Sequence, residues 1–221
     1  MTKIYLVPGL GNDVRIFSKL IPLLEGEGKE IVCLEHKEPL SLNETIPAYA
    51  KRMVECIPKT AEPPVLIGMS LGGTIATEMS KLMPLQKLIL ISTFKHKSEV
   101  PFLFKIARIL PLHLLVPAWF IRIVIPFFAR ILGICNREDT QTLRAMLYAC
   151  TASHFAWGRR AIVAWDNETY PSNFIHINGT KDHIFNLRQE QITHTIKNGT
   201  HNMVMDRAAE IATIIHREAL G

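Results

Sequence analysis

The sequence predicts an α/β protein with a mostly parallel sheet of about six strands, flanked by helices and carrying an inserted helical segment. Short apolar runs rich in Ile, Val and Leu recur along the 221 residues. Such runs are typical of strands that are covered on both faces. Segments with helical periodicity separate them, and strand–helix alternation at this spacing indicates right-handed βαβ units.

Six segments have the pattern of strands. In chain order they are Lys3–Val7, Glu30–His36, Pro64–Met69, Lys87–Thr93, Asn173–Gly179 and Ile192–Asn198. The first five are short and apolar, as buried strands of a parallel sheet are. Ile192–Asn198 alternates more between apolar and polar residues, so we expect this strand at an edge of the sheet.

Between the strands, apolar residues recur every three or four positions, which predicts amphipathic helices. The apolar stripes run from Val14 to Leu24, from Ile46 to Ile57, from Ile75 to Leu82 and from Val204 to Ile215, and a further amphipathic helix is expected within Thr151–Asn167.

Residues 94–148 are too long for a loop between sheet elements. We expect them to form a helical cap over the sheet, with residues 1–93 and 149–221 as the core domain. Pro111, Pro117 and Pro126 interrupt this cap, and because proline fixes φ and lacks an N–H, several short helices are expected. Within the cap, the longest run without Lys, Arg, Asp or Glu has 13 residues, fewer than the roughly 20 that span a bilayer.

The net charge of +5 is concentrated in the cap. Between Phe94 and Ile134 there are six basic residues and one acid, whereas the other 180 residues carry 19 of each sign. Proteins that bind nucleic acids normally carry basic residues over a whole face of the fold, so no nucleic-acid partner is expected. The basic residues Lys105, Arg108, Arg122 and Arg130 could instead steer an anionic substrate or rest on an anionic membrane surface.

Cysteine usage and the amino terminus predict a cytoplasmic protein. The four cysteines are scattered, with no CxxC pair; they are Cys33, Cys56, Cys135 and Cys150. We interpret them as small buried residues in a reducing compartment. The chain reaches Pro8 and Gly9 too early to contain the apolar region of a signal peptide.

Gly68-Met69-Ser70-Leu71-Gly72 fits G-x-S-x-G, the pattern of a nucleophilic serine on a sharp strand-to-helix turn. A predicted strand precedes it and a predicted helix follows it. A Cβ atom at Gly68 or Gly72 would collide with neighbouring backbone in such a tight turn. The Ser70 hydroxyl would project from the carboxyl end of a central strand, where open α/β sheets place their sites. A turn that merely caps the helix is the alternative interpretation.

A nucleophilic serine needs a base. Among the nine histidines, His201 follows the last predicted strand. Because the carboxyl ends of parallel strands meet at one edge, His201 can reach Ser70. His183 is the second candidate, since it neighbours the most favoured acid.

The base in turn needs an acid to orient it. Asp182 stands three residues beyond Gly179, past the end of the preceding strand, and could accept the imidazole Nδ1–H. A turn-forming aspartate is the alternative interpretation. Asp166 and Glu168 are weaker candidates, because they close a helix before that strand.

Two backbone amides are expected to bind the oxyanion of an acyl-transfer reaction. One is the amide of Leu71, at the start of the helix after Ser70, where the helix dipole is favourable. The other is the amide of Leu10 in the turn Pro8-Gly9-Leu10-Gly11. This turn could also bind phosphate, but it matches neither GxxxxGK[ST] nor GxGxxG.

Over essentially its whole length the chain resembles the α/β-hydrolase superfamily, in a small single-domain form with a helical cap. The resemblance lies in the elbow at Ser70, the order Ser70, Asp182, His201, and the turn Pro8–Gly11. It implies a sheet without the superfamily's two leading strands, because Lys3–Val7 resembles its third. Pro8-Gly9 stands where members commonly have His-Gly, and Gly199-Thr200-His201 where they commonly have Gly-Gly-His.

These residues and the resemblance together predict a serine hydrolase that cleaves a carboxylic ester through an acyl-enzyme. An apolar cap would line an acyl-binding pocket, and no metal or organic cofactor is expected. A thioesterase, an acyltransferase or a carbon–carbon bond hydrolase on the same residues is an alternative, as is a receptor or scaffold with low turnover. Dehalogenases and epoxide hydrolases are disfavoured, because they use aspartate where Ser70 stands. The oligomeric state stays open.

Overall fold

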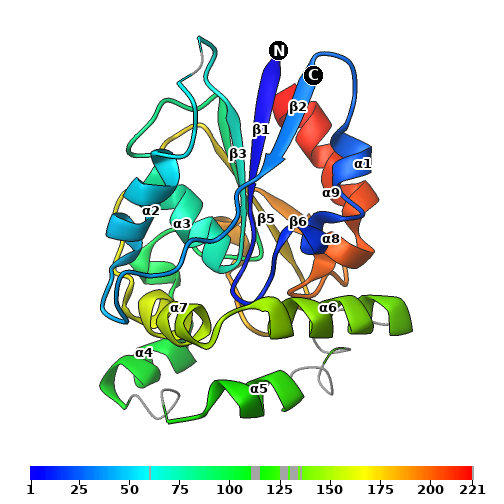
Figure 1. The fold of residues 1–221 in the computed structure, drawn as a ribbon. Helices are drawn as coiled ribbons and strands as arrows, with labels where there is room; N and C mark the ends of the chain where they lie inside the picture. The colour runs from blue at the N-terminus through cyan, green and yellow to red at the C-terminus, as the bar shows by residue number, and fades with distance from the viewer. Residues whose placement is uncertain (60, 111–114, 125–128, 130–133, 135, 221) are drawn as a thin grey trace.

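The computed structural model describes residues 1–59, 61–110, 115–124, 129, 134 and 136–220 (for 118, 121 and 122, the backbone alone). Within these residues, one six-stranded, all-parallel sheet has the strand order β2-β1-β3-β4-β5-β6 (Figure 1). The strands are β1 Thr2–Val7, β2 Lys29–Cys33, β3 Val65–Met69, β4 Lys87–Ile91, β5 Phe174–Gly179 and β6 His194–Ile196. The predicted α/β fold is confirmed, and the alternating segment lies at the sheet edge as β6.

The α-helices are α1 Ile21–Leu24, α2 Ile46–Val54, α3 Leu71–Met79, α4 Phe102–Ile109, α5 Ala118–Val124, α6 Arg137–Ala149, α7 Ala152–Ala164, α8 Met203–Asp206 and α9 Ala208–Ile215. Short 3-10 helices η1 Val14–Phe17, η2 Lys97–Glu99 and η5 Gln189–Gln191 and a π-helix, η6 His216–Leu220, complete the described elements.

Two of the predicted helical stripes do not form single helices. The stripe from Val14 to Leu24 is divided into η1 and α1, because Pro22 lacks an N–H and is accommodated only in the first turn of a new helix. The stripe from Val204 to Ile215 is divided at Arg207, whose backbone (φ −123°, ψ 24°) leaves the helical region. The predicted helix from Ile75 ends at Met79, before Leu82.

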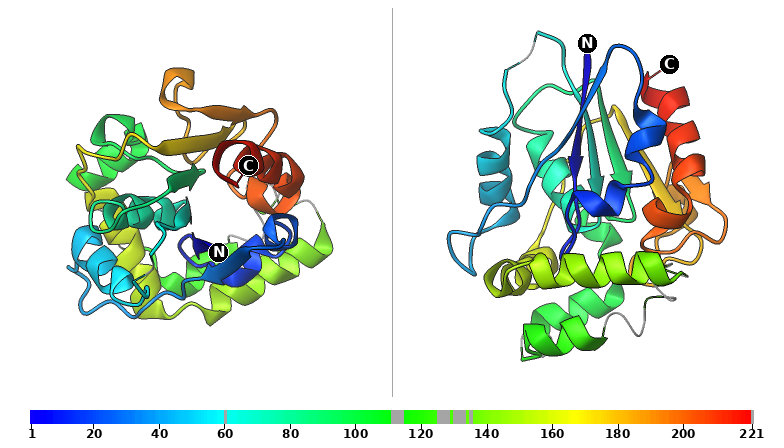
Figure 2. Two further views of the ribbon diagram at one scale, coloured as in Figure 1. Left: turned by 90° about the horizontal axis from the view of Figure 1, so that it is seen from above. Right: turned by 45° about the vertical axis from the view of Figure 1, so that its right-hand side comes forward.

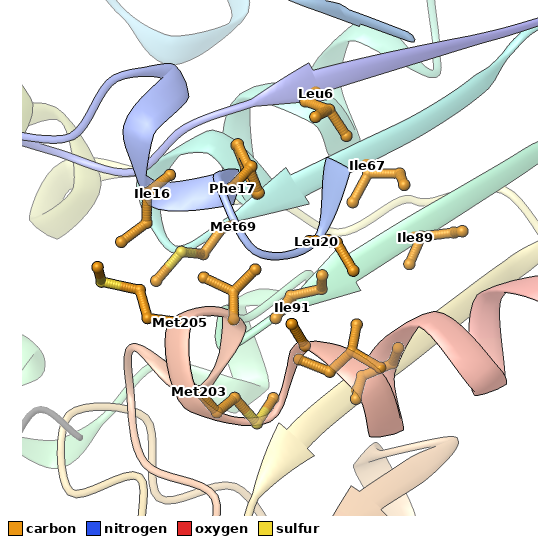
Figure 3. Packing of buried hydrophobic residues seen from close by; sticks show 14 of the residues in the cluster. Leu6, Ile16, Phe17, Leu20, Ile67, Met69, Ile89, Ile91, Met203 and Met205 are labelled. Carbon is orange, nitrogen blue, oxygen red and sulfur yellow. The ribbon is translucent and has the colours of Figure 1, made fainter. Parts of the chain in front are cut away.

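Successive side chains of the strands point to opposite faces of the sheet, and each face has its own core. On one face, Leu6, Ile67 and Ile89 pack with residues of η1, α1, α8 and α9, and Figure 3 shows them in one cluster with Phe17 and Met203. On the other face, residues such as Tyr5 and Leu66 pack with α2, α3 and α7. Burial on both faces explains why the strands are apolar throughout.

The predicted cap contains α4, α5 and α6, in keeping with the expectation of several short helices. Pro117 directly precedes α5, whereas Pro111 and Pro126 lie outside the described residues. Figures 1 and 2 show α6 and α7 across one end of the sheet, with α4 and α5 as an outer layer beyond them. The boundary at residues 148 and 149 stays a prediction.

The cysteines only partly match the expectation of burial. Cys33 is half-buried, and burial raises the pKa of its thiol to about 12. Cys56 is exposed, so the prediction for this residue is wrong: it lies two residues beyond the end of α2, where its side chain reaches solvent. Cys135 lies outside the described residues. No helix among the described residues is both long and apolar enough to cross a bilayer.

Candidate active site

Ser70 occupies a strained turn between β3 and α3. Its backbone has φ 53° and ψ −125°, a conformation that residues other than glycine rarely adopt. The Ser70 amide donates to the carbonyl of Ile91 at 3.0 Å, and the Ser70 carbonyl accepts from the hydroxyl of Thr93 at 2.7 Å. These bonds to the end of β4 hold the turn that aims the Ser70 hydroxyl away from the sheet.

The glycines on either side of Ser70 permit close backbone contacts. A Cβ atom built on Gly72 would lie 2.2 Å from the carbonyl oxygen of Val7 and 2.3 Å from that of Pro8. One built on Gly68 would lie 2.5 Å from the carbonyl oxygen of Gly72. These distances are far below van der Waals contact, so α3 can begin this close to β1 and β3 only with glycine at both positions.

The structure brings Ser70, His201 and Asp182 together from three separate segments. The His201 Nε2 atom lies 3.0 Å from Ser70 Oγ, and His201 Nδ1 lies 3.1 Å from Asp182 Oδ2. A carboxylate only accepts hydrogen bonds, so Nδ1 donates to Asp182 and Nε2 is left to accept from the Ser70 hydroxyl. All three side chains are buried, with 3 to 9% of each residue exposed.

The surroundings of Asp182 favour its ionised form. Its Oδ1 atom accepts from the amides of Ile184 at 2.9 Å and Phe185 at 3.0 Å. Burial by itself would raise the pKa of this carboxyl, but the charge and hydrogen bond of His201 and the two amides outweigh burial and hold the pKa below its usual value. Asp182 is therefore fixed as a charged acceptor for the imidazole N–H.

The other candidates from the sequence lie elsewhere. His183 is exposed to solvent. Asp166 forms an ion pair with Arg108 at 3.6 Å, and Glu168 pairs with Lys97; both acids are more than half exposed. Neither acid is joined to His201, so Asp182 is the acid that the fold brings to this histidine.

The residues of the two predicted oxyanion donors both lie close to Ser70. Leu71 is the first residue of α3, so its amide is among the helix N–H groups that have no acceptor within the helix. The turn with Leu10 passes directly beside Ser70, since a Cβ atom on Gly9 would lie 3.1 Å from Ser70 Cβ. Leu10 lines the pocket that contains Ser70.

Ser70 and His201 open on a pocket of about 470 Å³. Its walls are mostly apolar and come from α4 (Leu103, Phe104, Ala107), α6 (Leu143, Leu147), α7 (Phe155, Arg159, Ile162, Val163) and the segment after β5 (Ile184, Phe185). Asn12 and Asn202 add polar groups near the serine. The space next to the Ser70 hydroxyl is therefore bordered mainly by apolar side chains.

Sequence reasoning missed several residues that shape this site. His36 follows β2, and its Nε2 lies 3.3 Å from the carbonyl oxygen of Gly9, in the turn that contains Leu10. Burial lowers the pKa of His36 to about 3, so the ring is neutral and can donate to this carbonyl. Arg159 brings a cation to the pocket wall from α7, a helix that had been assigned only to the core. Both contacts join segments far apart in the chain, so no local pattern indicates them.

Among the residues that the structure describes, no three His, Cys, Asp or Glu side chains are grouped so that they could hold a metal ion.

The comparisons with known proteins agree with this architecture. The family model described as Alpha/beta hydrolase family matches residues 4–214. The chain therefore belongs to the α/β hydrolase family. No curated protein sequence matches it.

Solved structures share the fold at low sequence identity. A hydrolase from Pseudomonas aeruginosa PA01 is similar with a TM-score of 0.77 and 14% identity, over 100% of this chain and 90% of that one. The Bacillus megaterium epoxide hydrolase has a TM-score of 0.76 and 12% identity (100% and 94% covered). The Exiguobacterium antarcticum esterase has a TM-score of 0.72 and 14% identity, over 100% of this chain and 92% of that one. At these identities the likeness establishes the fold, and the chemistry must be argued from the site.

Proposed function

We propose that the protein is a serine hydrolase that cleaves a carboxylic ester with an apolar acyl group. The observation that carries this proposal is the hydrogen-bonded chain Ser70–His201–Asp182 at the floor of an apolar pocket. In this arrangement a base contacts the serine and an ionised acid orients the base, which is the geometry of an activated nucleophile.

The proposed reaction has two halves. Ser70 Oγ attacks the ester carbonyl carbon while His201 Nε2 takes the hydroxyl proton, and the amides of Leu10 and Leu71 bind the resulting oxyanion. The tetrahedral intermediate collapses as His201 returns the proton to the leaving alcohol, leaving an acyl-enzyme. Water then attacks this ester by the same route and releases the acid. Asp182 stays ionised and stabilises the imidazolium in both halves.

The walls of the pocket support an apolar acyl group. Side chains from α4, α6 and α7 surround the space next to Ser70, and the hydrophobic effect favours hydrocarbon there over water. The same chain of residues could serve a thioesterase, an acyltransferase or a carbon–carbon bond hydrolase. Supplying alcohols or thiols as acceptors tests for transfer, since a transferase would form new esters or thioesters at the expense of free acid.

Labelling with a fluorophosphonate probe tests the nucleophile directly. We expect one adduct per chain on Ser70, found by mass spectrometry, and none in Ser70→Ala. The variant should keep the fold, and its kcat on p-nitrophenyl esters should fall about 10⁶-fold, toward the residual rate that binding and the oxyanion donors leave. Ser80→Ala is the matched control, because Ser80 caps the far end of α3. An unlabelled, folded wild-type protein would favour a receptor or scaffold instead.

The acyl preference can be read from p-nitrophenyl esters of rising chain length. We expect kcat/KM to rise from acetate to medium chains, because each added CH₂ that is buried contributes about 0.8 kcal/mol, or roughly fourfold. Ile162→Trp, which fills part of the pocket, should move the optimum to shorter chains. If kcat/KM does not depend on chain length and Ile162→Trp does not change it, the pocket is not the acyl-binding site. The cytoplasmic location and the absence of nucleic-acid partners stay predictions.

A further inference from the structure

The outer layer formed by α4 and α5 exposes an unusual density of large apolar side chains. Nine of the seventeen exposed large apolar side chains of the described residues lie between residues 102 and 123. They are Phe102, Leu103, Ile106, Ile109, Leu110, Leu115, Trp119, Phe120 and Ile123, named here the apolar patch. No side chain of α4 is fully buried. Soluble proteins rarely leave such clusters in water unless they bind something.

The chain segment that carries the apolar patch has charged residues of one sign only. Residues 100–137 contain no Asp or Glu, and Lys105 is exposed on α4 among the patch residues. Other cations of the cap are already paired with acids: Lys95 with Glu99, Lys97 with Glu168, and Arg108 with Asp166. The apolar side chains, rather than the full charge excess, therefore dominate this surface, and the remaining positive charge favours an anionic neighbour.

We propose that the apolar patch docks the protein on the surface of a lipid bilayer. Aromatic and aliphatic side chains bordered by basic residues are the composition of helices that lie in the membrane interface. Aromatic residues such as Trp119 favour the headgroup level, and Lys105 can extend toward lipid phosphates. A helix of eight residues such as α4 is about 12 Å long, against a hydrocarbon core of about 30 Å, so it lies in the interface.

A second copy of the chain fits this surface less well. A two-fold contact would place two identical surfaces face to face, each with Lys105 and neither with an acid from residues 100–137. Like charges brought together in an apolar contact are destabilising. A bilayer that contains anionic lipids meets the apolar side chains and the positive charge at the same time.

The apolar patch is continuous with the pocket. Leu103 belongs to the patch and also lines the pocket, and Phe104 and Ala107 line it from the same helix. Docking would therefore bring the pocket wall next to lipid, and an ester with a long acyl chain could enter from the bilayer. This substrate route rests on the proposed function, whereas the docking itself does not.

Tryptophan fluorescence measures the docking directly. The chain has three tryptophans, and only Trp119 is exposed, at 62%; Trp157 and Trp165 are buried in the core. On adding phosphatidylcholine vesicles with phosphatidylglycerol, we expect the emission of Trp119 to shift to shorter wavelength and to be quenched by lipids with brominated acyl chains. Trp119→Phe should remove both signals. Vesicles that leave the emission unchanged would overturn the proposal.

Variants test whether the apolar patch itself, rather than exposed apolar side chains in general, binds the vesicles. Phe102→Ser/Ile109→Ser changes two patch residues outside the pocket and should weaken co-sedimentation with vesicles tenfold or more. The reason is that serine has much less apolar surface to bury in the bilayer than phenylalanine or isoleucine. Leu23→Ser/Leu82→Ser, with two exposed leucines (42% and 51%) away from α4 and α5, should bind as the wild type does. Lys105→Glu should weaken binding about tenfold on vesicles with phosphatidylglycerol and leave binding to pure phosphatidylcholine unchanged.

Three results would overturn the proposal. The first is no association of the wild type with either vesicle. The second is an equal loss in the two double variants, with their unfolding midpoints as the check on folding. The third is a dimer in size-exclusion chromatography that Phe102→Ser/Ile109→Ser abolishes without any vesicle binding, which would assign the patch to a second copy. Ser70→Ala protein should bind vesicles like the wild type, so a failed hydrolase assignment and a failed docking assignment are distinguishable.

Discussion

Replacing Gly72 by alanine tests whether the elbow needs the backbone contacts seen here. The added Cβ would lie 2.2 Å from the carbonyl oxygen of Val7 and 2.3 Å from that of Pro8, about 1 Å inside van der Waals contact. Both neighbours are backbone atoms at the end of β1, which pairs with β2 and β3 and cannot move alone. The start of α3 must therefore shift by roughly 1 Å.

This shift should affect stability and activity together. Overpacking against backbone costs typically 1–3 kcal/mol or more, so we expect the free energy of unfolding to fall by about 3 kcal/mol. Ser70 moves with the start of α3, and a 1 Å misplacement of a reacting group can lower kcat about 100-fold. Urea unfolding and p-nitrophenyl ester hydrolysis measure the two effects.

Gly26→Ala is the matched control for Gly72→Ala. The nearest atoms to a Cβ at Gly26 belong to the flexible side chain of Lys29, at 3.9 Å and beyond. The control should change the unfolding free energy by less than about 1 kcal/mol and leave the rate unchanged. If Gly72→Ala unfolds and reacts as Gly26→Ala does, the close approach of α3 to β1 is not what requires glycine in the elbow.

Two further predictions concern titratable groups. Asp182→Asn should retain the fold but lower kcat about 10⁴-fold, because a neutral amide can neither fix the Nδ1–H tautomer of His201 nor stabilise its charged form; a drop under tenfold would contradict this role. For His36, burial lowers the pKa to about 3, so the unfolded chain takes up a proton below about pH 6.5 while the folded chain does not. The stability from the neutral ring is complete above pH 6.5 and is lost as the pH falls, by about 2 kcal/mol at pH 5. His36→Gln should lack this part of the pH dependence in urea unfolding at pH 8 and 5, and equal slopes in both proteins would contradict it.

The sheet and the positions of the site residues were predictable because each depends on local sequence and on one general rule. Apolar runs bounded by polar residues indicate buried strands, and a parallel sheet brings their carboxyl ends to one edge. Placing Ser70, Asp182 and His201 after three different strands is therefore enough to predict that the side chains can meet, as the distances of 3.0 and 3.1 Å show that they do. Their catalytic roles await the probe experiment.

Contacts between distant segments could not be predicted in this way. The sequence shows a charge excess in the cap, but not that Arg108 pairs with Asp166 and Lys97 with Glu168, partners that are 58 and 71 residues apart in the chain. The contact of His36 with the carbonyl of Gly9 likewise crosses 27 residues. Net charge can be counted from the sequence, but the pairing of acids with bases depends on the fold. The composition alone therefore does not give the charge of the exposed surface.

The apolar character of α4 has a physical meaning that neither the sheet nor the pocket accounts for. A helix that is apolar on most sides is normally buried, but only the side with Phe104 and Ala107 meets the pocket, while Phe102, Ile106 and Ile109 remain in water. Burying one such side chain is worth about 1.5–3 kcal/mol, so leaving several exposed forgoes much of the stability of a typical domain. A bilayer surface would recover this free energy, and because α4 also forms part of the pocket wall, that surface would lie close to the space beside Ser70.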